Sequence, residues 1–282
     1  MCRLVAYMGH KVLLEDVLVK PSNSLIMQSL HAKESHVRTN GDGFGLGWYV
    51  PHLGKVPGLF TSIYPAWNDR NLLHLCCKIE SPCFFAHVRA ASAGGVTTYN
   101  CHPFTHGEWM FMHNGTIHDF ILLKRHLRHL LDDDIYHWIQ GETDSEHLFA
   151  LFLQLAKNRD LSQIKEVAAV FIETLKIVND LSKQYSSHVG PSYFNVCITN
   201  GTSMLVSRYS NSKRHKPESL HYLTESSLIR HAQRPGLKKI KNSPMILVAS
   251  ERLSAFNSEW FDVPVNHCML VENHEINFLV VS

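Results

Sequence analysis

The sequence lacks an excess of either charge. It contains 27 Lys and Arg residues and 25 Asp and Glu residues, which gives a formal net charge of +2. The longest basic stretches, at 213–216 and 238–241, are short and contain no interleaved aromatic side chains. Surfaces that bind nucleic acid usually combine dense positive charge with aromatic residues. We therefore expect no nucleic-acid partner.

Long apolar runs are also absent. None approaches the roughly 20 consecutive apolar residues that a bilayer-spanning helix needs. The N-terminal segment MCRLVAYMGHKVLLED ends on the acidic pair Glu15 and Asp16 and has no small-residue cleavage site, unlike a signal peptide. We therefore expect no membrane span and no membrane partner.

Cysteines do not occur in paired motifs. The seven cysteines, at positions 2, 76, 77, 83, 101, 197 and 268, are odd in number and show no zinc-site or disulfide-framework spacing. This usage fits a reducing, cytoplasmic setting. A zinc enzyme using His74, Cys76, Cys77 and Cys83 is a poor alternative, because adjacent cysteines cannot readily bind one ion tetrahedrally. We expect no metal and no other cofactor.

Enough apolar sequence is present for a substantial core. With 45% hydrophobic content in 282 residues, we expect one layered domain over residues 1–282. Apolar spacing predicts helices between about residues 120 and 178. Strands are predicted on both sides of them, at residues 2–8, in CFFAHVRAAS, WMFMH, YFNVCIT, SMLVSRY and PMILVAS, and in the tail. Strands, then helices, then strands predict an α+β sandwich.

Two segments carry patterns that a core does not require. In NGDGFGLGWY, glycines at positions 41, 43, 45 and 47 strip one face of side chains, so another backbone or a ligand can approach closely. In CFFAHVRAAS, a period of two places Phe85, His87 and Arg89 on one face. That face is expected to be partly polar.

Cys2 is a candidate nucleophile. Removal of Met1 would free an α-amine on the same residue as the thiol, and that amine can accept the thiol proton directly or through one water. An N-terminal threonine nucleophile uses the same arrangement. The alternative is an ordinary small apolar residue near a chain end.

Four further residues match the needs of an acyl transfer on a γ-glutamyl group. The Asn114 side chain and the Gly115 N–H form a potential oxyanion hole, or an ordinary turn after a strand. Arg89 can clamp the substrate α-carboxylate, or be a surface arginine. Asp144 can point outward and hold the α-ammonium, or only cap a helix beside a capping box of Thr143 and Glu146.

These motifs in chain order resemble the class II glutamine amidotransferase family: Met-Cys, NGDGFGLGWY, AHVRAAS, NCHPF, MHNG and TDSE. The resemblance covers almost the whole chain and implies the four-layer αββα sandwich of N-terminal nucleophile hydrolases. It also implies roles for individual residues: Cys2 as nucleophile, Asn114 and Gly115 as oxyanion hole, Arg89 as carboxylate clamp and Asp144 as ammonium ligand. His87, His102 and Ser92 match pocket-forming positions, although either histidine can equally be structural.

The chain is most similar to the stand-alone branch of this family. That branch includes the amidotransferase-like subunit of the fungal glutathione-degrading complex, whose other subunit resembles a metallopeptidase, and bacterial hydrolases of a γ-glutamyl conjugate in ergothioneine synthesis. The resemblance implies hydrolysis of glutathione or a related γ-glutamyl thiol conjugate through a thioester on Cys2, and a metallopeptidase-like protein partner. The alternatives are a glutaminase that supplies ammonia to a separate synthase and a catalytically silent binding module.

Overall fold

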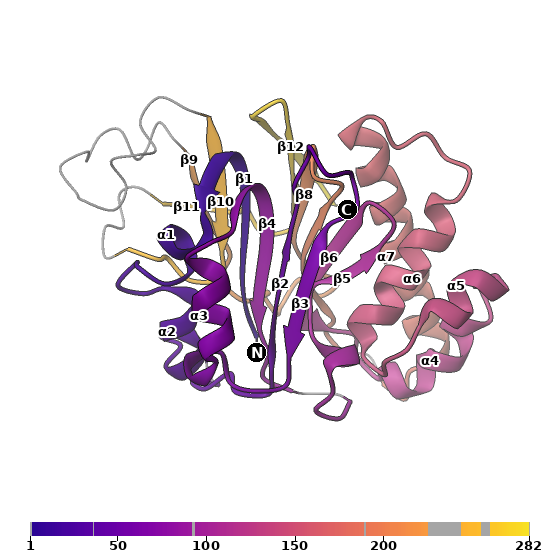
Figure 1. Ribbon diagram of the computed structural model, residues 1–282. Helices are drawn as coiled ribbons and strands as arrows, with labels where there is room; N and C mark the ends of the chain where they lie inside the picture. Colours follow the sequence, from indigo (N-terminus) through magenta and orange to yellow (C-terminus); the bar gives the residue numbers. More distant parts are fainter. Residues whose placement is uncertain are drawn as a thin grey trace.

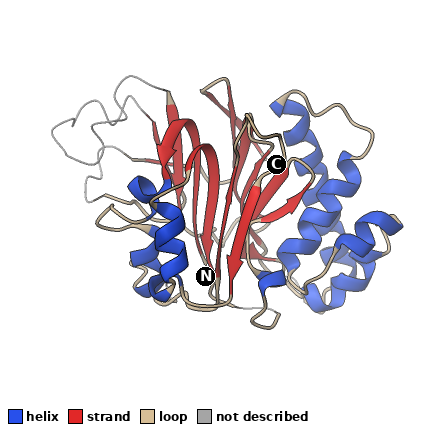
Figure 2. Ribbon diagram, in the orientation of Figure 1, coloured by secondary structure: helices blue, strands red, loops and turns tan. Residues whose placement is uncertain are grey.

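The computed structural model describes residues 2–35, 37–91, 94–188, 190–224, 244–254 and 260–281. Two β-sheets face each other in the middle of the molecule, and helices cover the outer side of each (Figure 1, Figure 2). The predicted α+β class and four-layer αββα arrangement are therefore confirmed. None of the helices in the described ranges has the length and apolar character needed to cross a membrane.

The sheets are antiparallel throughout the pairings of the described residues. The first sheet has the order β11 (Phe261–Asp262), β9 (His221–Thr224), β10 (Met245–Ala249), β1 (Arg3–Leu13), β4 (Glu80–Val88), β2 (Phe44–Trp48) and β3 (Gly58–Ser62). The second has the order β13 (Glu275–Val280), β12 (His267–Glu272), β8 (Ser203–Ser210), β7 (Tyr193–Thr199), β6 (Trp109–Thr116) and β5 (Phe104–His106).

Helices from two separate parts of the chain form the outer layers (Figure 1). The first sheet is covered by α1 (Leu14–Leu18), α2 (Leu25–Leu30) and α3 (Arg70–Cys76). The second is covered by α4 (Phe120–Arg128), α5 (Asp133–Trp138), α6 (Asp144–Ala156) and α7 (Ile164–Tyr185), which include the helices predicted from spacing. Two short 3₁₀ turns, η1 (Ala66–Asn68) and η2 (Thr98–Asn100), lie in connections.

Three apolar clusters fill the spaces between the layers. Alternate side chains of β1 contribute to two of these clusters. Leu4 and Ala6 pack between the two sheets, whereas Val5 and Tyr7 pack under α1 and α2. Successive side chains of a strand point to opposite faces. Residue 2 therefore continues on the side of Leu4, toward the space between the sheets.

The N-terminal strand is held on both sides. β1 pairs with β10 along one edge and with β4 along the other, and it extends to Leu13 rather than ending near Met8. A terminal segment frays unless it is tied into a sheet. This pairing fixes the start of the chain.

The alternative interpretation of Asn114 and Gly115, an ordinary turn after a strand, is wrong. Both residues belong to β6, where they lie opposite Asn195 and Phe194 of β7. A partner strand supplies backbone pairing that the local sequence does not reveal. The chain turns later, near Asp119, whose backbone is left-handed at φ 51°.

Candidate active site

Cys2 lies immediately before β1, half-buried beside the end of β4. Its Sγ accepts the backbone N–H of Ala90 at 3.4 Å and is 3.5 Å from the carbonyl oxygen of the same residue. Burial raises the pKa of the Cys2 thiol, while the hydrogen bond with Ala90 and the charges of Arg89 and Arg3 oppose that rise. The thiol therefore needs a base before it can attack. Met1 lies outside the described residues, so its removal stays a prediction.

Arg89 follows β4 directly, one residue before the contact of Cys2. The side chain is buried, and its two terminal nitrogens donate to the carbonyl oxygens of Gly95 at 3.2 Å and Gly94 at 3.4 Å. The residue also bonds through its backbone to Gly43 and Asp42, which come from the predicted glycine-rich loop. The carbonyl oxygens of Gly94 and Gly95 thus help to hold the guanidinium at the end of β4.

The glycine-rich segment permits close packing, as predicted. A Cβ at Gly45 would lie 2.1 Å from the carbonyl oxygen of His102, and one at Gly47 would lie 2.4 Å from the sulfur of Met110. Both distances are far inside van der Waals contact, so side chains are excluded there. The absence of side chains lets β2 lie against the segment that contains His102.

Asn114 reaches from the second sheet toward the first. Its side chain is buried, and its Nδ2 donates to the hydroxyl of Ser250 at 3.5 Å, while Oδ1 has no hydrogen-bond partner among the described residues. The same hydroxyl accepts the N–H of Leu4 at 3.0 Å, and the N–H of Ser250 donates to the carbonyl of Leu4. One serine therefore links the candidate oxyanion residue to the strand that carries Cys2.

Gly115 is required by packing. A Cβ there would lie 2.0 Å from the carbonyl oxygen of Tyr193 and 2.3 Å from Nε2 of His113. Its neighbour His113 is anchored through both ring nitrogens, to Ser145 and to the Tyr193 carbonyl, each at 2.9 Å. The geometry of this end of β6 is therefore closely determined.

Asp144 is the first residue of α6, and it is buried rather than directed outward as predicted. Its Oδ2 accepts the N–H of Ile117 at 2.8 Å, and its Oδ1 accepts the N–H of Ser145 at 2.8 Å. These bonds fix the carboxylate just beyond the end of β6. Two acceptor oxygens with remaining lone pairs suit an ammonium ligand.

The capping box predicted around Asp144 forms only in part. Thr143 accepts the N–H of Glu146, but the Glu146 carboxylate bonds the N–H groups of Gln140 and Gly141 instead of that of Thr143. The loop before α6 folds back over the helix end and takes these bonds. The sequence predicted Thr143 as the N-cap residue of α6. The partner of Glu146 could not be predicted, because it depends on how that loop folds.

His87 and His102 come together, with ring centroids 4.3 Å apart. Both are buried, and no ring nitrogen of either has a hydrogen-bond partner among the described residues. Burial, and after it the charge of Arg89, lowers the pKa of His87 to about 3, and burial followed by the nearby His87 places the pKa of His102 well below its usual value. Burial thus favours the neutral form of both rings at physiological pH. Ser92 lies outside the described residues.

Two residues that connect distant segments were not predicted from the sequence. Asn100, which precedes the NCHPF cysteine, donates to the Gly95 carbonyl at 2.8 Å and accepts the N–H of Glu142 at 3.0 Å. It thereby joins the loop that holds Arg89 to the loop before α6. Its place in the motif was visible, but its partner Glu142 lies 42 residues away in the sequence.

Arg3 is the second residue whose role was not predicted from the sequence. Its side chain is fully buried, and its Nε lies 3.3 Å from the carboxylate of Glu251, which is also fully buried. That carboxylate accepts the N–H groups of Lys33 and Glu34. A charged residue inside the apolar β1 segment was the available signal, because such a charge needs a partner.

The structure thus brings Cys2, Arg89, His87 and His102 to one end of the first sheet, and Asn114, Gly115 and Asp144 to the facing end of β6. No hydrogen bond within the described part of the chain joins Cys2 directly to Asn114 or Asp144; the Ser250 contact makes the link to Asn114. The zinc alternative fails, since Cys76 packs under the helices and Cys83 between the sheets.

Comparisons with known proteins identify the family of this chain. The family model of the class II glutamine amidotransferases matches residues 1–280. DUG3 of Saccharomyces cerevisiae, named a probable glutamine amidotransferase, is 35% identical over 298 aligned positions, which cover 98% of this chain and 83% of the yeast protein. The γ-glutamyl-hercynylcysteine sulfoxide hydrolase of Mycobacterium tuberculosis is 30% identical over 124 residues, 43% of this chain and 52% of that protein.

Solved structures support the fold. A glutamine aminotransferase class-II domain protein from Silicibacter pomeroyi superposes with a TM-score of 0.69 at 23% identity, with full coverage of both chains. The glutamine phosphoribosylpyrophosphate amidotransferase of Bacillus subtilis gives a TM-score of 0.62 at 14% identity, over all of this chain and 49% of that one.

Proposed function

Because the chain belongs to the class II glutamine amidotransferases, we propose that it hydrolyses the γ-glutamyl amide bond of glutathione or a related γ-glutamyl thiol conjugate. The observation that carries the proposal is the placement of the Cys2 thiol against Ala90, next to the fixed guanidinium of Arg89. A nucleophile and a carboxylate clamp then share one end of β4. The relatives named for γ-glutamyl hydrolysis and for glutamine amidotransfer support the same bond type.

In the proposed reaction, Cys2 attacks the γ-carbonyl carbon. The α-amine freed by Met1 removal takes the thiol proton, and the oxygen of the tetrahedral intermediate receives hydrogen bonds from the Asn114 amide and the Gly115 N–H. The carbon–nitrogen bond breaks, the amine leaves with the proton, and a thioester to Cys2 remains. Water then cleaves the thioester, which releases glutamate and restores the thiol.

The substrate ends are assigned by charge. Arg89 would pair with the α-carboxylate, and Asp144 would hold the α-ammonium beyond the end of β6. Because Asp144 is fixed by the N–H groups of Ile117 and Ser145, it offers an oriented anion without a further conformational change. His87, His102 and Ser92 would shape the pocket around the glutamyl chain.

The decisive experiment uses the purified chain with its N-terminal mass determined. Cys2→Ala should abolish glutathione hydrolysis with an unchanged circular dichroism spectrum, and an electrophilic glutamine analogue should label Cys2 in the unmodified chain. Retained activity in Cys2→Ala, or an active protein that keeps Met1, would falsify the mechanism. Unlabelled Cys2 together with no turnover would instead favour a silent binding module.

Glutamine is the second candidate substrate, because the matching family is named for it. Rates on glutamine and on glutathione, measured with the same preparation, separate a glutaminase from a thiol-conjugate hydrolase. We further propose a metallopeptidase-like protein partner and a cytoplasmic location. All seven cysteines are free thiols, which supports a reducing compartment.

A further inference from the structure

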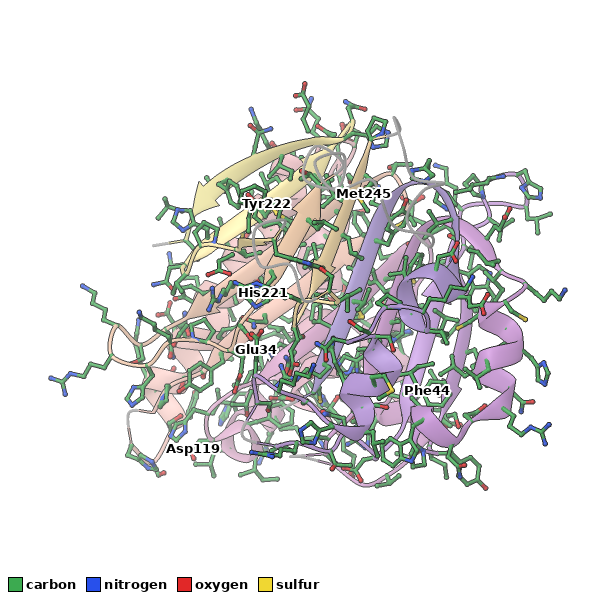
Figure 3. The ribbon with its side chains drawn as sticks, turned by 90° about the vertical axis from the view of Figure 1, so that its left-hand side faces the viewer. Glu34, Phe44, Asp119, His221, Tyr222 and Met245 are labelled. Carbon is green, nitrogen blue, oxygen red and sulfur yellow. The ribbon has the colours of Figure 1, made fainter. Side chains whose placement is uncertain are left out.

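Three potential metal ligands meet where β6 leads into α4, outside the site described above. His118 and Asp119 occupy that turn, and His188 follows α7. One ligand atom from each lies within 4.8 Å of the others. Figure 3 shows Asp119 at the lower edge of the molecule, away from Phe44 of β2.

The spacing between the first two ligands suits a shared ion. Nε2 of His118 is buried, makes no hydrogen bond to any described residue and lies 3.6 Å from Oδ2 of Asp119. Two ligand atoms about 2.1 Å from one tetrahedral zinc ion are about 3.4 Å apart. The pair is therefore too far apart for a hydrogen bond and close to the separation that a common metal imposes.

His188 completes the cluster. Its ring lies 4.7 Å from that of His118, centroid to centroid, at an interplanar angle of 76°. The residue is exposed, so rotation of its side chain can shorten the remaining separation without disturbing the core. Rings that meet edge to face can direct their nitrogens toward one point.

Surrounding groups orient these ligands. Ser187 donates its N–H at 2.9 Å and its hydroxyl at 2.8 Å to Asp119, and the same hydroxyl is 3.0 Å from Nδ1 of His188. A Cβ on Gly190 would lie 2.3 to 2.4 Å from atoms of the His118 ring, so only glycine admits that ring. Hydrogen bonds to ligating side chains are a usual part of metal sites.

We propose that His118, Asp119 and His188 bind one divalent transition-metal ion. Two imidazoles and one carboxylate form a donor set that suits zinc, and three protein ligands leave one position for water.

The ion would tie two distant segments together near the candidate active site. The turn begins at His118, three residues after Gly115. Just before it, Ile117 donates its N–H to Asp144, and the N–H of His118 donates to Ser192. A metal at this point would therefore hold the segment after α7 against the end of β6. It would take no part in the chemistry of Cys2.

The test is calorimetric titration of the EDTA-treated full chain with zinc chloride. We expect one ion per chain, with affinity reduced at least tenfold in Asp119→Asn and in His188→Gln. Asparagine tolerates the left-handed backbone at 119 and can still accept from Ser187, and His188 is exposed, so both variants should fold. His137→Gln, on the exposed side of α5, is the matched control and should bind as the unmodified chain does.

A cobalt titration gives an independent readout. Absorption typical of nitrogen and oxygen ligands is expected, and it should weaken in the two variants but not in the control. Thiolate charge-transfer bands, binding that is unchanged in both variants, or no binding by the unmodified chain would each overturn the proposal. These readouts do not depend on γ-glutamyl hydrolysis.

Discussion

Ser250 should matter for catalysis although it does not touch the thiol. Its hydroxyl accepts the N–H of Leu4 at 3.0 Å and lies 3.5 Å from Nδ2 of Asn114. Ser250→Ala removes both contacts in a fully buried position and leaves the Leu4 N–H without its side-chain acceptor. An unsatisfied buried group costs about 1–3 kcal/mol, so the free energy of unfolding should fall by that amount.

The expected effect on kcat follows from the longer of these two contacts, the one between Ser250 and Asn114. Loss of an oxyanion donor itself costs about 10²- to 10³-fold in kcat. Asn114 stays in Ser250→Ala but loses its anchor, so we expect a smaller fall, on the order of tenfold, with KM nearly unchanged. Urea denaturation measures the first effect, and steady-state hydrolysis of glutathione measures the second.

Ser219→Ala supplies the matched control. Ser219 donates to the Ser250 carbonyl but is not hydrogen-bonded to Leu4 or Asn114. The control should show little change in kcat. If Ser250→Ala loses stability and keeps full kcat, the serine is only structural and the positioning argument is wrong.

Three other predictions follow from single features of the structure. Gly115→Ala should destabilise the fold by about 1–3 kcal/mol in urea denaturation, because its Cβ would lie 2.0 Å from the Tyr193 carbonyl; an unchanged midpoint would contradict this packing. Arg3→Met should cost about 3–5 kcal/mol by leaving Glu251 buried without its cation, and Arg3→Met combined with Glu251→Gln should recover part of that loss in the same assay. The free energy of unfolding should decrease as the pH is lowered from about 6.5 to 4. Burial lowers the pKa of His87 to about 3 and that of His147 to about 4, so the unfolded chain binds protons that the folded chain does not. A flat profile of stability over that range would refute this.

Local sequence patterns predicted the fold class. Alternation in β4 and helical spacing in α4, α6 and α7 predicted elements that the structure contains. Short helices such as α2 were not predicted, because six residues give too little periodicity to recognise. Asn114 and Gly115 were read as a turn because their pairing with β7 depends on residues about 80 positions later.

The sequence by itself determined the identity of the candidate nucleophile, clamp and oxyanion residues, since each type of residue is dictated by the chemistry of an amide bond. It also determined the period-two alternation that places Phe85, His87 and Arg89 on one face of β4. Only the tertiary structure decided what holds them: Ser250 between Leu4 and Asn114, Glu251 against Arg3, and backbone N–H groups on Asp144. These contacts join segments far apart in the chain, and no local pattern records them, because a buried polar group requires a partner but does not specify which one.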